Sequence, residues 1–297
     1  MKLIKYLKKY IKNPLGVIYA LGKLGWFKWV PDRIYLKLIY RGETGKTLKL
    51  NNPKTFNEKL QWLKLYDRKP EYSIYVDKYE VRSYIERTIG KEYLIPLIGL
   101  YNKVDEIKWD KLPQRFVIKC THGSGTNIIC TDKDKLDLEE AKKKLRKWMK
   151  KNWYWSGREW PYKNVKPRII CEEFISENDD PPMDYKVLCF NGKAKLIEVH
   201  INRFGNHKQD FYTIDWNKTN ISQKKSISSI VLDKPLVLDK MIELSEMLAR
   251  DKYHVRIDWY VIFNKLYFGE ITFYDGSGLC PFDSEDDDLL LGNMLVL

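Results

Sequence analysis

The feature that most constrains the fold of this 297-residue chain is a pair of alternating segments, residues 254–262 and 266–273. In both segments apolar side chains alternate with polar ones, which predicts two antiparallel strands joined by a turn near Asn264. Five earlier segments also have strand character: 116–120, 128–130, 168–173, 184–190 and 195–201. Asn-Gly at 191–192 predicts a hairpin between the last two of them. The chain is therefore expected to contain extensive antiparallel sheet.

Helices are expected around these strands, which indicates the α+β fold class. Thr55 and Glu58 form a capping box that begins a helix ending near Tyr66. Three further helices are predicted: 73–89, 137–151 and 238–250. An acidic run at 283–288 is expected to be a solvated loop or the start of a helix.

The register of the C-terminal hairpin decides which side chains share a face. A three-residue loop, 263–265, places Asp258 opposite Glu270 and Arg256 opposite Thr272. A two-residue loop would move one acid into the apolar layer, so three residues are expected. Adjacent carboxylates repel unless a cation lies between them, and Mg²⁺ prefers oxygen ligands together with substrate phosphates. The pair therefore indicates a magnesium site; the alternative is a sheet face on which Arg256 neutralises one acid.

A second candidate site is the loop between the first two predicted strands. Lys119 is on the strand that enters it, and the loop contains Gly123, Ser124 and Gly125. Glycines allow backbone N–H groups to approach phosphates, and the lysine offsets phosphate charge. The loop is not a Walker A motif, which needs Gly-Lys-Ser/Thr at the start of a helix. It is a candidate triphosphate-covering loop, with an ordinary strand connection as the alternative.

A third candidate is the end of the strand 168–173, where Glu172 and Glu173 precede Phe174 and Ile175. Backbone groups at such a strand end can bind an adenine edge, and a carboxylate can bind its amino group or a ribose. The alternative is an edge strand that ends in solvent. Three residues on later strand-like segments supply further charges: Asp184, Lys186 and Arg203. Taken by themselves, such residues usually form structural ion pairs. Two histidines, His122 and His207, are expected to face solvent, with substrate contact as the alternative.

The net charge of +13 is concentrated at the N-terminus. Residues 1–50 contain 12 of the 53 Lys and Arg but only 2 of the 40 Asp and Glu. The remainder is nearly neutral, which argues against a nucleic-acid binder. Residues 1–12 predict an amphipathic helix with a lysine face. Two interpretations stay open: this arm packs on the body, or residues 1–30 lie on an anionic membrane surface.

Location follows from apolar stretches and cysteines. No apolar run is long enough to span a membrane, and no signal cleavage site follows the short apolar stretch 13–22. Five cysteines without a C-x-x-C pair lie mostly in apolar runs, which indicates buried thiols in a reducing compartment. A cytoplasmic protein is expected, peripheral on the inner membrane face if the arm binds lipid.

Taken in sequence order, these segments resemble an ATP-grasp ligase. The similar positions are Asp77-Lys78 with Arg82 and Pro96, Lys119 with its glycine loop, residues 172–175, Asp184 with Lys186 and Arg203, and Asp258 with Glu270. The superfamily often has Asn where this chain has Thr272. Three motifs, 55–68, 157–162 and 269–274, more narrowly resemble the TupA-like ATP-grasp amidoligases of bacterial cell-surface polysaccharide synthesis.

The resemblance implies an ATP-grasp fold in which two α+β lobes grip ATP. The implied division is a basic amphipathic helical arm, 1–50, and a helical region, 51–112. A small lobe with the glycine loop, 113–171, and a large lobe with the magnesium hairpin, 172–297, would follow.

The resemblance also implies an activity: an ATP-dependent ligase joins an amino acid or other amine to a uronic-acid carboxylate, in a small or lipid-linked sugar, through an acyl phosphate. The implied ATP-binding residues are Lys78, Lys119, Gly123, Ser124, Gly125, Glu172, Glu173, Phe174, Ile175, Asp184 and Lys186. Asp258, Glu270 and Thr272 would hold Mg²⁺, and Arg203 and Lys186 would be catalytic. The alternatives are a glycosyltransferase that uses a nucleotide sugar, and a non-catalytic ATP-binding partner of a glycan-assembly complex.

Overall fold

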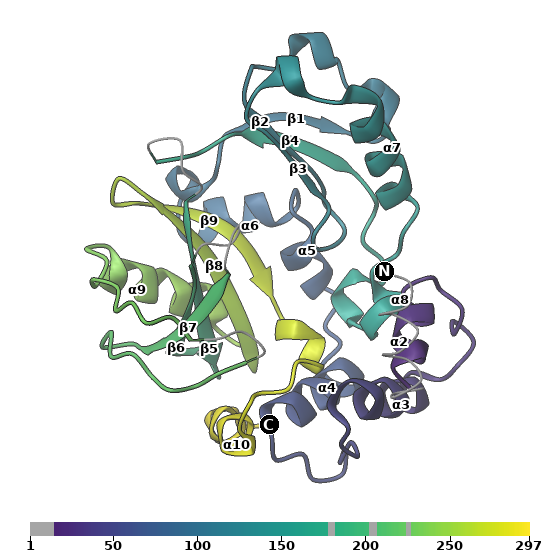
Figure 1. The fold of residues 1–297 in the computed structure, drawn as a ribbon, viewed down its shortest axis with the longest axis vertical. Coiled ribbons are helices and arrows are strands. Elements are labelled where there is room, and N and C mark those ends of the chain that lie inside the picture. Colours follow the sequence, from purple (N-terminus) through teal and green to yellow (C-terminus); the bar gives the residue numbers. More distant parts are fainter. Residues whose placement is uncertain (1–14, 178–181, 202–206, 224–226) are drawn as a thin grey trace.

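The computed structural model describes residues 15–177, 182–201, 207–223 and 227–297, and its strands form two antiparallel sheets (Figure 1). The four-stranded sheet, in the order β1-β4-β2-β3, consists of β1 (Leu97–Tyr101), β2 (Phe116–Cys120), β3 (Asn127–Cys130) and β4 (Ile169–Glu173). The five-stranded sheet, in the order β7-β6-β5-β8-β9, consists of β5 (Met183–Phe190), β6 (Lys193–Ile201), β7 (Lys208–Thr213), β8 (His254–Ile262) and β9 (Lys265–Thr272). The α+β prediction is confirmed, and β1 and β7 are strands that the sequence pattern did not predict.

Helices surround the two sheets. The α-helices are α2 (Gly16–Gly22), α3 (Asp32–Thr44), α4 (Phe56–Tyr66), α5 (Tyr72–Val76), α6 (Val81–Thr88), α7 (Leu138–Met149), α8 (Tyr154–Gly157), α9 (Leu238–Ala249) and α10 (Glu285–Met294). The 3-10 segments are η1 (Lys91–Tyr93), η2 (Val104–Glu106), η3 (Trp109–Lys111), η4 (Lys133–Lys135), η5 (Trp160–Tyr162) and η6 (Asp275–Gly278). The predicted helices at 55–66, 137–151 and 238–250 are confirmed as α4, α7 and α9.

Two predicted helix starts are seen in the side-chain contacts. The capping box of α4 is present, because Glu58 N donates to Thr55 Oγ1 at 3.3 Å and Thr55 N donates to Glu58 Oε2 at 3.2 Å. The acidic run begins α10, but it is not wholly solvated. Asp288 is buried and accepts a hydrogen bond from Asn57 N at 2.9 Å, which ties α10 to α4.

The prediction of one helix over 73–89 is wrong, because the chain breaks between α5 and α6. Asp77 is extended at this point, with ψ 116°. Its Oδ1 accepts from Tyr79 N at 2.8 Å, and its Oδ2 accepts from Arg168 at 2.8 Å. The next N–H, that of Lys78, donates to Thr121 O at 3.1 Å. These hydrogen bonds take the place of the backbone bonds that would continue a helix. They involve residues far along the chain, so the helical pattern of the sequence cannot reveal them.

The C-terminal hairpin confirms the predicted pairing but not the predicted loop. Asp258 lies opposite Glu270, yet the loop has only two residues, Phe263 and Asn264, both with positive φ. The register shifts by one residue at a β-bulge, where Gly269 is the additional residue of β9. A Cβ at Gly269 would lie 3.0 Å from the backbone oxygen of Asp258. The bulge therefore returns both acids to one face after a turn that would separate them.

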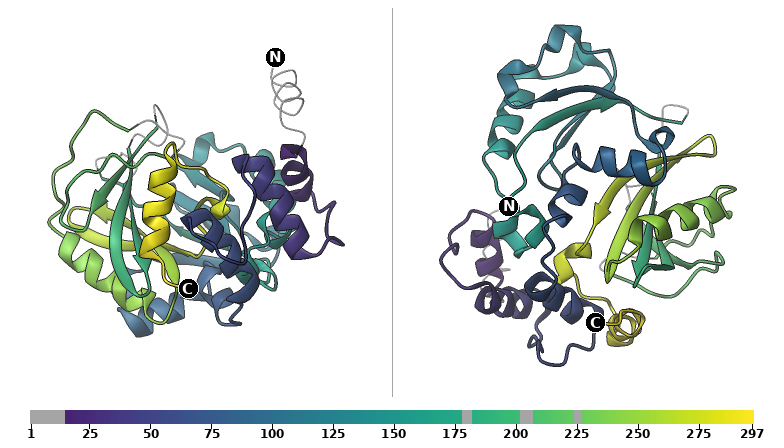
Figure 2. Two further views of the ribbon diagram at one scale, coloured as in Figure 1. Left: turned by 90° about the horizontal axis from the view of Figure 1, so that it is seen from below. Right: turned by 180° about the vertical axis from the view of Figure 1, so that it is seen from behind.

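Each sheet is covered on one face by a helix. Helix α9 packs on β5, β6 and β8 of the five-stranded sheet, where Trp259 donates from Nε1 to Ser245 Oγ at 2.8 Å (Figures 1 and 2). Helix α7 lies against the four-stranded sheet and contributes Leu145 to a core that includes Phe116 and Ile118. The other face of the five-stranded sheet carries the charged residues described below.

The N-terminal segment packs on the body from residue 15 onward, whereas the predicted helix 1–12 lies outside the described residues. Tyr35, Leu36 and Ile39 of α3 are buried. Arg158 fastens the segment by donating to Phe27 O at 2.6 Å. None of the helices in the described ranges has the length and hydrophobicity needed to cross a bilayer.

Candidate active site

Four charged side chains form a row across four neighbouring strands of the five-stranded sheet. Glu198 on β6 lies opposite Lys186 on β5. Lys186 lies in turn opposite Asp258 on β8, and Asp258 lies opposite Glu270 on β9. Residues directly opposite each other share a face, so the row is continuous. Its first three members are almost fully buried, and burial strengthens the interactions between their charges.

Asp258 is bound by cations on both sides. Arg256 donates from Nε to Oδ1 at 2.7 Å and from Nη2 to Oδ2 at 2.8 Å. Lys186 also donates to Oδ2, and its ammonium reaches Asp184 Oδ2 at 2.9 Å. Burial raises the pKa of Asp258 above its usual range, although Arg256 and Lys186 oppose this shift. The predicted residues Asp184, Lys186 and Asp258 therefore form one network.

Glu270 has a different environment from its neighbour. Lys78 donates to Glu270 Oε2 at 2.8 Å, and Thr272 donates to Oε1 at 3.5 Å. Burial alone would raise the pKa of Glu270, but the positive charges of Lys78 and Arg256 lower it well below its usual range. Glu270 is thus ionised at neutral pH, and the two facing acids differ in proton affinity.

Glu172 connects the four-stranded sheet to the same site. Lys119 Nζ lies 2.6 Å from its Oε2, and Arg82 donates to its Oε1 at 3.0 Å. Burial alone would lower the pKa of Lys78, but Glu270, Glu172 and Asp258 raise it. Lys78 therefore lies in the field of acids from both sheets, because the break before α6 directs it between them.

The segment after β4 adjoins this junction. Glu173 is exposed, and its N–H donates to Pro96 O at 3.0 Å. Phe174 packs under the guanidinium of Arg115 at 4.3 Å, and Ile175 is half-buried. The adenine-binding role of these residues stays a prediction.

The glycine loop contains both exposed and buried residues. Ser124 and Gly125 are exposed and Gly123 is buried. Gly125 has φ +65°, and a Cβ at this position would meet no atom within 4 Å. His122 is not solvent-facing as predicted, because it is 4% exposed and its Nε2 lies 3.2 Å from Trp148 O. Packing of α7 against the loop, which loop composition does not reveal, explains this burial.

Two other residues named from the sequence are Arg203 and His207. Arg203 lies outside the described residues. His207 is half-buried rather than solvent-facing, because it contacts His200 on β6. The sequence prediction includes Arg256 only in the alternative in which it neutralises one acid, and the structure shows this pairing, because Arg256 binds Asp258 and also donates to Asp275. Its place in the alternation of β8 was the available signal.

The fit of a metal ion follows from the donor set. Among the residues that the structure describes, no three His, Cys, Asp or Glu side chains are arranged to hold a metal. Asp258, Glu270 and Thr272 offer only oxygen donors, and two are carboxylates. Such a set suits Mg²⁺ that takes its remaining ligands from phosphates and water. Both oxygens of Asp258 bind Arg256 or Lys186 in this structure, so a metal ion there would replace one of these contacts.

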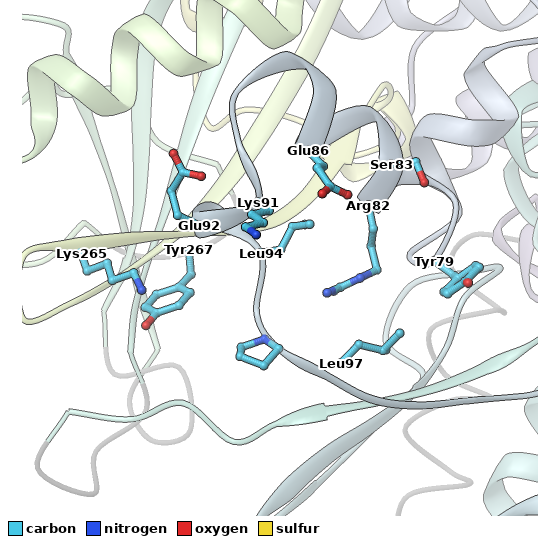
Figure 3. Close-up of a pocket in the computed structure, with 11 residues that line it drawn as sticks. Tyr79, Arg82, Ser83, Glu86, Lys91, Glu92, Leu94, Leu97, Lys265 and Tyr267 are labelled. Carbon is cyan, nitrogen blue, oxygen red and sulfur yellow. The ribbon is translucent and has the colours of Figure 1, made fainter.

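A cavity of about 620 Å³ lies beside α6, away from the charged row. Tyr79 and Arg82 lie on one side of it, and Lys265 and Tyr267 of β9 lie on the other (Figure 3). Arg82 also binds Glu172. The cavity therefore adjoins the junction of the two sheets but contains none of the row's acids.

The sequence pattern of the TupA-like ATPgrasp family matches residues 58–296, most of the chain and all of the site. The protein belongs to this family. TupA-like ATP-grasp membership makes it an ATP-grasp ligase with ATP as a substrate and confirms the predicted fold class. It also selects the ligase over the glycosyltransferase alternative. No curated protein sequence matches the chain significantly.

The solved structures to which the chain is similar share little sequence with it. D-Alanine-D-alanine ligase from Helicobacter pylori has a TM-score of 0.47 and 17% identity, over 82% of this chain and 70% of that chain. D-Alanyl-alanine synthetase A from Vibrio cholerae gives 0.45 and 12%, over 85% and 72%. L-Amino acid ligase from Bacillus licheniformis gives 0.44 and 12%, over 84% and 55%. The assignment to the TupA-like ATP-grasp family rests on the sequence match alone.

Proposed function

We propose that this protein is a carboxylate–amine ligase that joins an amine to the carboxylate of a uronic-acid sugar. The observation that carries the proposal is a set of three lysine–acid pairs at the junction of the two sheets: Lys186 binds Asp258, Lys78 binds Glu270, and Lys119 binds Glu172. Lys78, Lys119 and Lys186 converge from three elements, and Asp258 faces Glu270. Paired acids with surrounding cations suit a metal-bound triphosphate.

The chemistry requires activation of the carboxylate. An amine does not displace oxide from a carboxylate, whereas phosphate leaves readily from an acyl phosphate. Asp258, Glu270 and Thr272 would hold Mg²⁺, which supplies charge neutralisation on the β- and γ-phosphates. Lys119 and Lys78 would offset further phosphate charge, and Lys186 with Arg256 would face the transferred group. Arg203, proposed from the sequence as catalytic, would also act on the transferred phosphoryl group.

Nucleotide binding would involve both sheets. The glycine loop, with Gly123, Ser124 and Gly125, would cover the phosphates, and residues 172–175 would contact adenine and ribose. The exposed position of Ser124 and Gly125 supports this role, because the loop can move onto a ligand without breaking core contacts.

The experiment is an assay of ADP release across uronic-acid sugars, nucleotide-linked and lipid-linked, each combined with every amino acid. The proposal expects one pair to give ADP, phosphate and a product whose mass is the sum of both substrates less water. AMP and pyrophosphate as products would contradict the acyl-phosphate route. An absence of ADP release with every uronic acid, but release with another carboxylate, would contradict the sugar assignment.

Attachment to an anionic membrane is part of the same proposal. Leu24, Trp26 and Trp29 are 71%, 66% and 80% exposed and follow the basic residues of the arm. Aromatic side chains favour the membrane interface, and nearby lysines contribute about 1 kcal/mol each on an anionic surface. Co-sedimentation with anionic vesicles at low salt should decrease in a Trp26→Ala/Trp29→Ala variant. Equal, negligible sedimentation of both proteins would contradict attachment.

A further inference from the structure

Two histidines and a glutamate form a hydrogen-bonded chain at the β6 end of the charged row. His200 and Glu198 are two residues apart on β6, so they share the face that carries the row. His200 Nε2 contacts Glu198 Oε1, and His200 Nδ1 lies 2.7 Å from Nε2 of His207. Gln209 on β7 donates to the same Glu198 oxygen at 2.7 Å. None of these contacts has a role in the ATP chemistry described above.

Glu198 determines how protons are arranged in this chain. Burial alone would raise its pKa, but the hydrogen bond from His200 and the charge of Arg256 lower it to about 2. An ionised Glu198 accepts a hydrogen bond from the Nε2–H of His200, so Nδ1 of a neutral His200 carries a lone pair. Nε2 of His207 then donates to that lone pair.

The histidine pair extends the charged row along the same face of the five-stranded sheet. Glu198 is opposite Lys186, which is opposite Asp258, and neighbouring strands are about 4.8 Å apart. The backbones of β6 and β8 are therefore about 10 Å apart, with Lys186 between them. The other charged groups around the pair are Asp184, opposite His200, together with Arg256 and Asp275. An amine that attacks a carbonyl held at Lys186 and Arg256 can approach from the β6 side.

We propose that His200 and His207, supported by Glu198, accept the proton of the amine substrate; the inference rests on the proposed ligase function. The ammonium form of the amine first gives one proton to the histidine pair, and the freed nitrogen lone pair then forms the C–N bond. The C–O bond to phosphate breaks, and its electron pair leaves with the phosphate. Both protons that nitrogen loses enter at His207, because both ring nitrogens of His200 are already hydrogen-bonded to Glu198 and His207, and they pass from the chain to solvent. Formation of ADP and the acyl phosphate precedes this transfer and needs no base.

The test compares two nucleophiles in His200→Asn and Glu198→Gln variants. The amino acid identified by the ADP-release assay is protonated at neutral pH and must lose a proton before it attacks. Hydroxylamine is already unprotonated and attacks without this step; its proton leaves only after the C–N bond has formed, when the nitrogen is strongly acidic. Product masses report the amide and the hydroxamate separately. We expect the ratio of amide to hydroxamate formation to fall about 100-fold in His200→Asn, the scale of general base catalysis, and by a smaller factor in Glu198→Gln. An equal decrease of both products would overturn the inference, because it would indicate a structural role.

The control and the wild-type protein separate this inference from the proposed function. Glu243→Gln, an exposed acid on α9 across the sheet, should leave the ratio unchanged. Wild-type protein that forms both products, with a ratio that His200→Asn does not alter, contradicts only the proton acceptor. Wild-type protein that forms neither product from any carboxylate contradicts the ligase function and the inference together.

Discussion

The two sheets present their charged residues in different ways. In the five-stranded sheet, Lys186 and Asp258 are nearly fully buried, and each binds at least two charged neighbours. In the four-stranded sheet, Lys119 binds Glu172, and the loop beyond it is exposed at its tip. One sheet therefore provides a fixed array of charges, whereas the other provides one lysine and a loop with room to move. A site that encloses a nucleotide needs both properties, since the phosphates require fixed charge and must also enter.

The largest expected effect comes from the fixed array. Glu270→Ala should reduce ATP turnover about 10³-fold, because it removes a proposed metal ligand and leaves Lys78 without its 2.8 Å partner. The measurement is ADP release by purified protein, with circular dichroism to verify folding. Glu243→Ala is the matched control on α9. Near-normal turnover in a folded Glu270→Ala protein would contradict the claim that the β8–β9 hairpin is part of the active site.

A smaller effect is expected on the other sheet. Lys119→Ala should lower kcat/KM for ATP about 100-fold, mainly through KM, because Lys78 and Lys186 still contribute charge. Arg82 also still binds Glu172 at 3.0 Å, so the strand end stays in place. Steady-state kinetics with varied ATP measures this effect. A loss as large as that of Glu270→Ala would show that the two sheets do not differ as described.

Stability should depend on pH through the five-stranded sheet. Burial lowers the pKa of His254 to about 3, and the ring packs 4.9 Å from the ring of Phe56. Below its unfolded pKa of 6.5 the unfolded chain binds a proton that the folded chain does not, so stability decreases as pH falls toward 3. The loss from pH 7 to pH 5 should be about 2 kcal/mol from this residue.

Denaturant unfolding of wild type and His254→Leu at both pH values measures that contribution. The variant should lose less stability than the wild type between pH 7 and pH 5, because leucine does not titrate. Equal losses in the two proteins would show that another group is responsible.

The smallest effects are expected at two glycines, one in the C-terminal hairpin and one in the glycine loop. Gly269→Ala should destabilise the protein by about 2 kcal/mol, because its Cβ would crowd the backbone of Asp258 at the bulge. Gly125→Ala should cost about 1 kcal/mol, because only its positive φ disfavours a side chain and the space around it is open. Unfolding free energies of both variants provide the test. The reverse order would contradict the contrast between a packed hairpin and an open loop.

Local pattern was sufficient to predict much of this molecule. Alternation predicted β2, β8 and β9 closely, and Asn191-Gly192 marked the β5–β6 turn, where Asn191 has φ 48°. The capping signal at Thr55 predicted the start of α4. The facing of Asp258 and Glu270 was also predicted, but through a loop length that is wrong, because sequence alone does not place a bulge at Gly269.

What the sequence could not predict depends on contacts between distant segments. Asp77 ends α5 because Arg168, far along the chain, binds its carboxylate. His122 is buried because α7 packs beside its loop. The link from His200 to His207 requires the register of β6 and β7, and β7 itself lacked a clear alternating pattern. Side chains that act together in this site come from elements whose proximity only the fold determines.

The central claim, that the facing acids of β8 and β9 hold a metal-bound triphosphate, has one direct measurement. Isothermal titration calorimetry of a non-hydrolysable ATP analogue, with and without Mg²⁺, requires no knowledge of the sugar or the amine. Wild-type protein should bind the analogue more tightly with Mg²⁺, and Asp258→Asn/Glu270→Gln should lose that gain while retaining weak Mg²⁺-independent binding. An equal gain from Mg²⁺ in the wild-type and double-variant proteins would contradict the account.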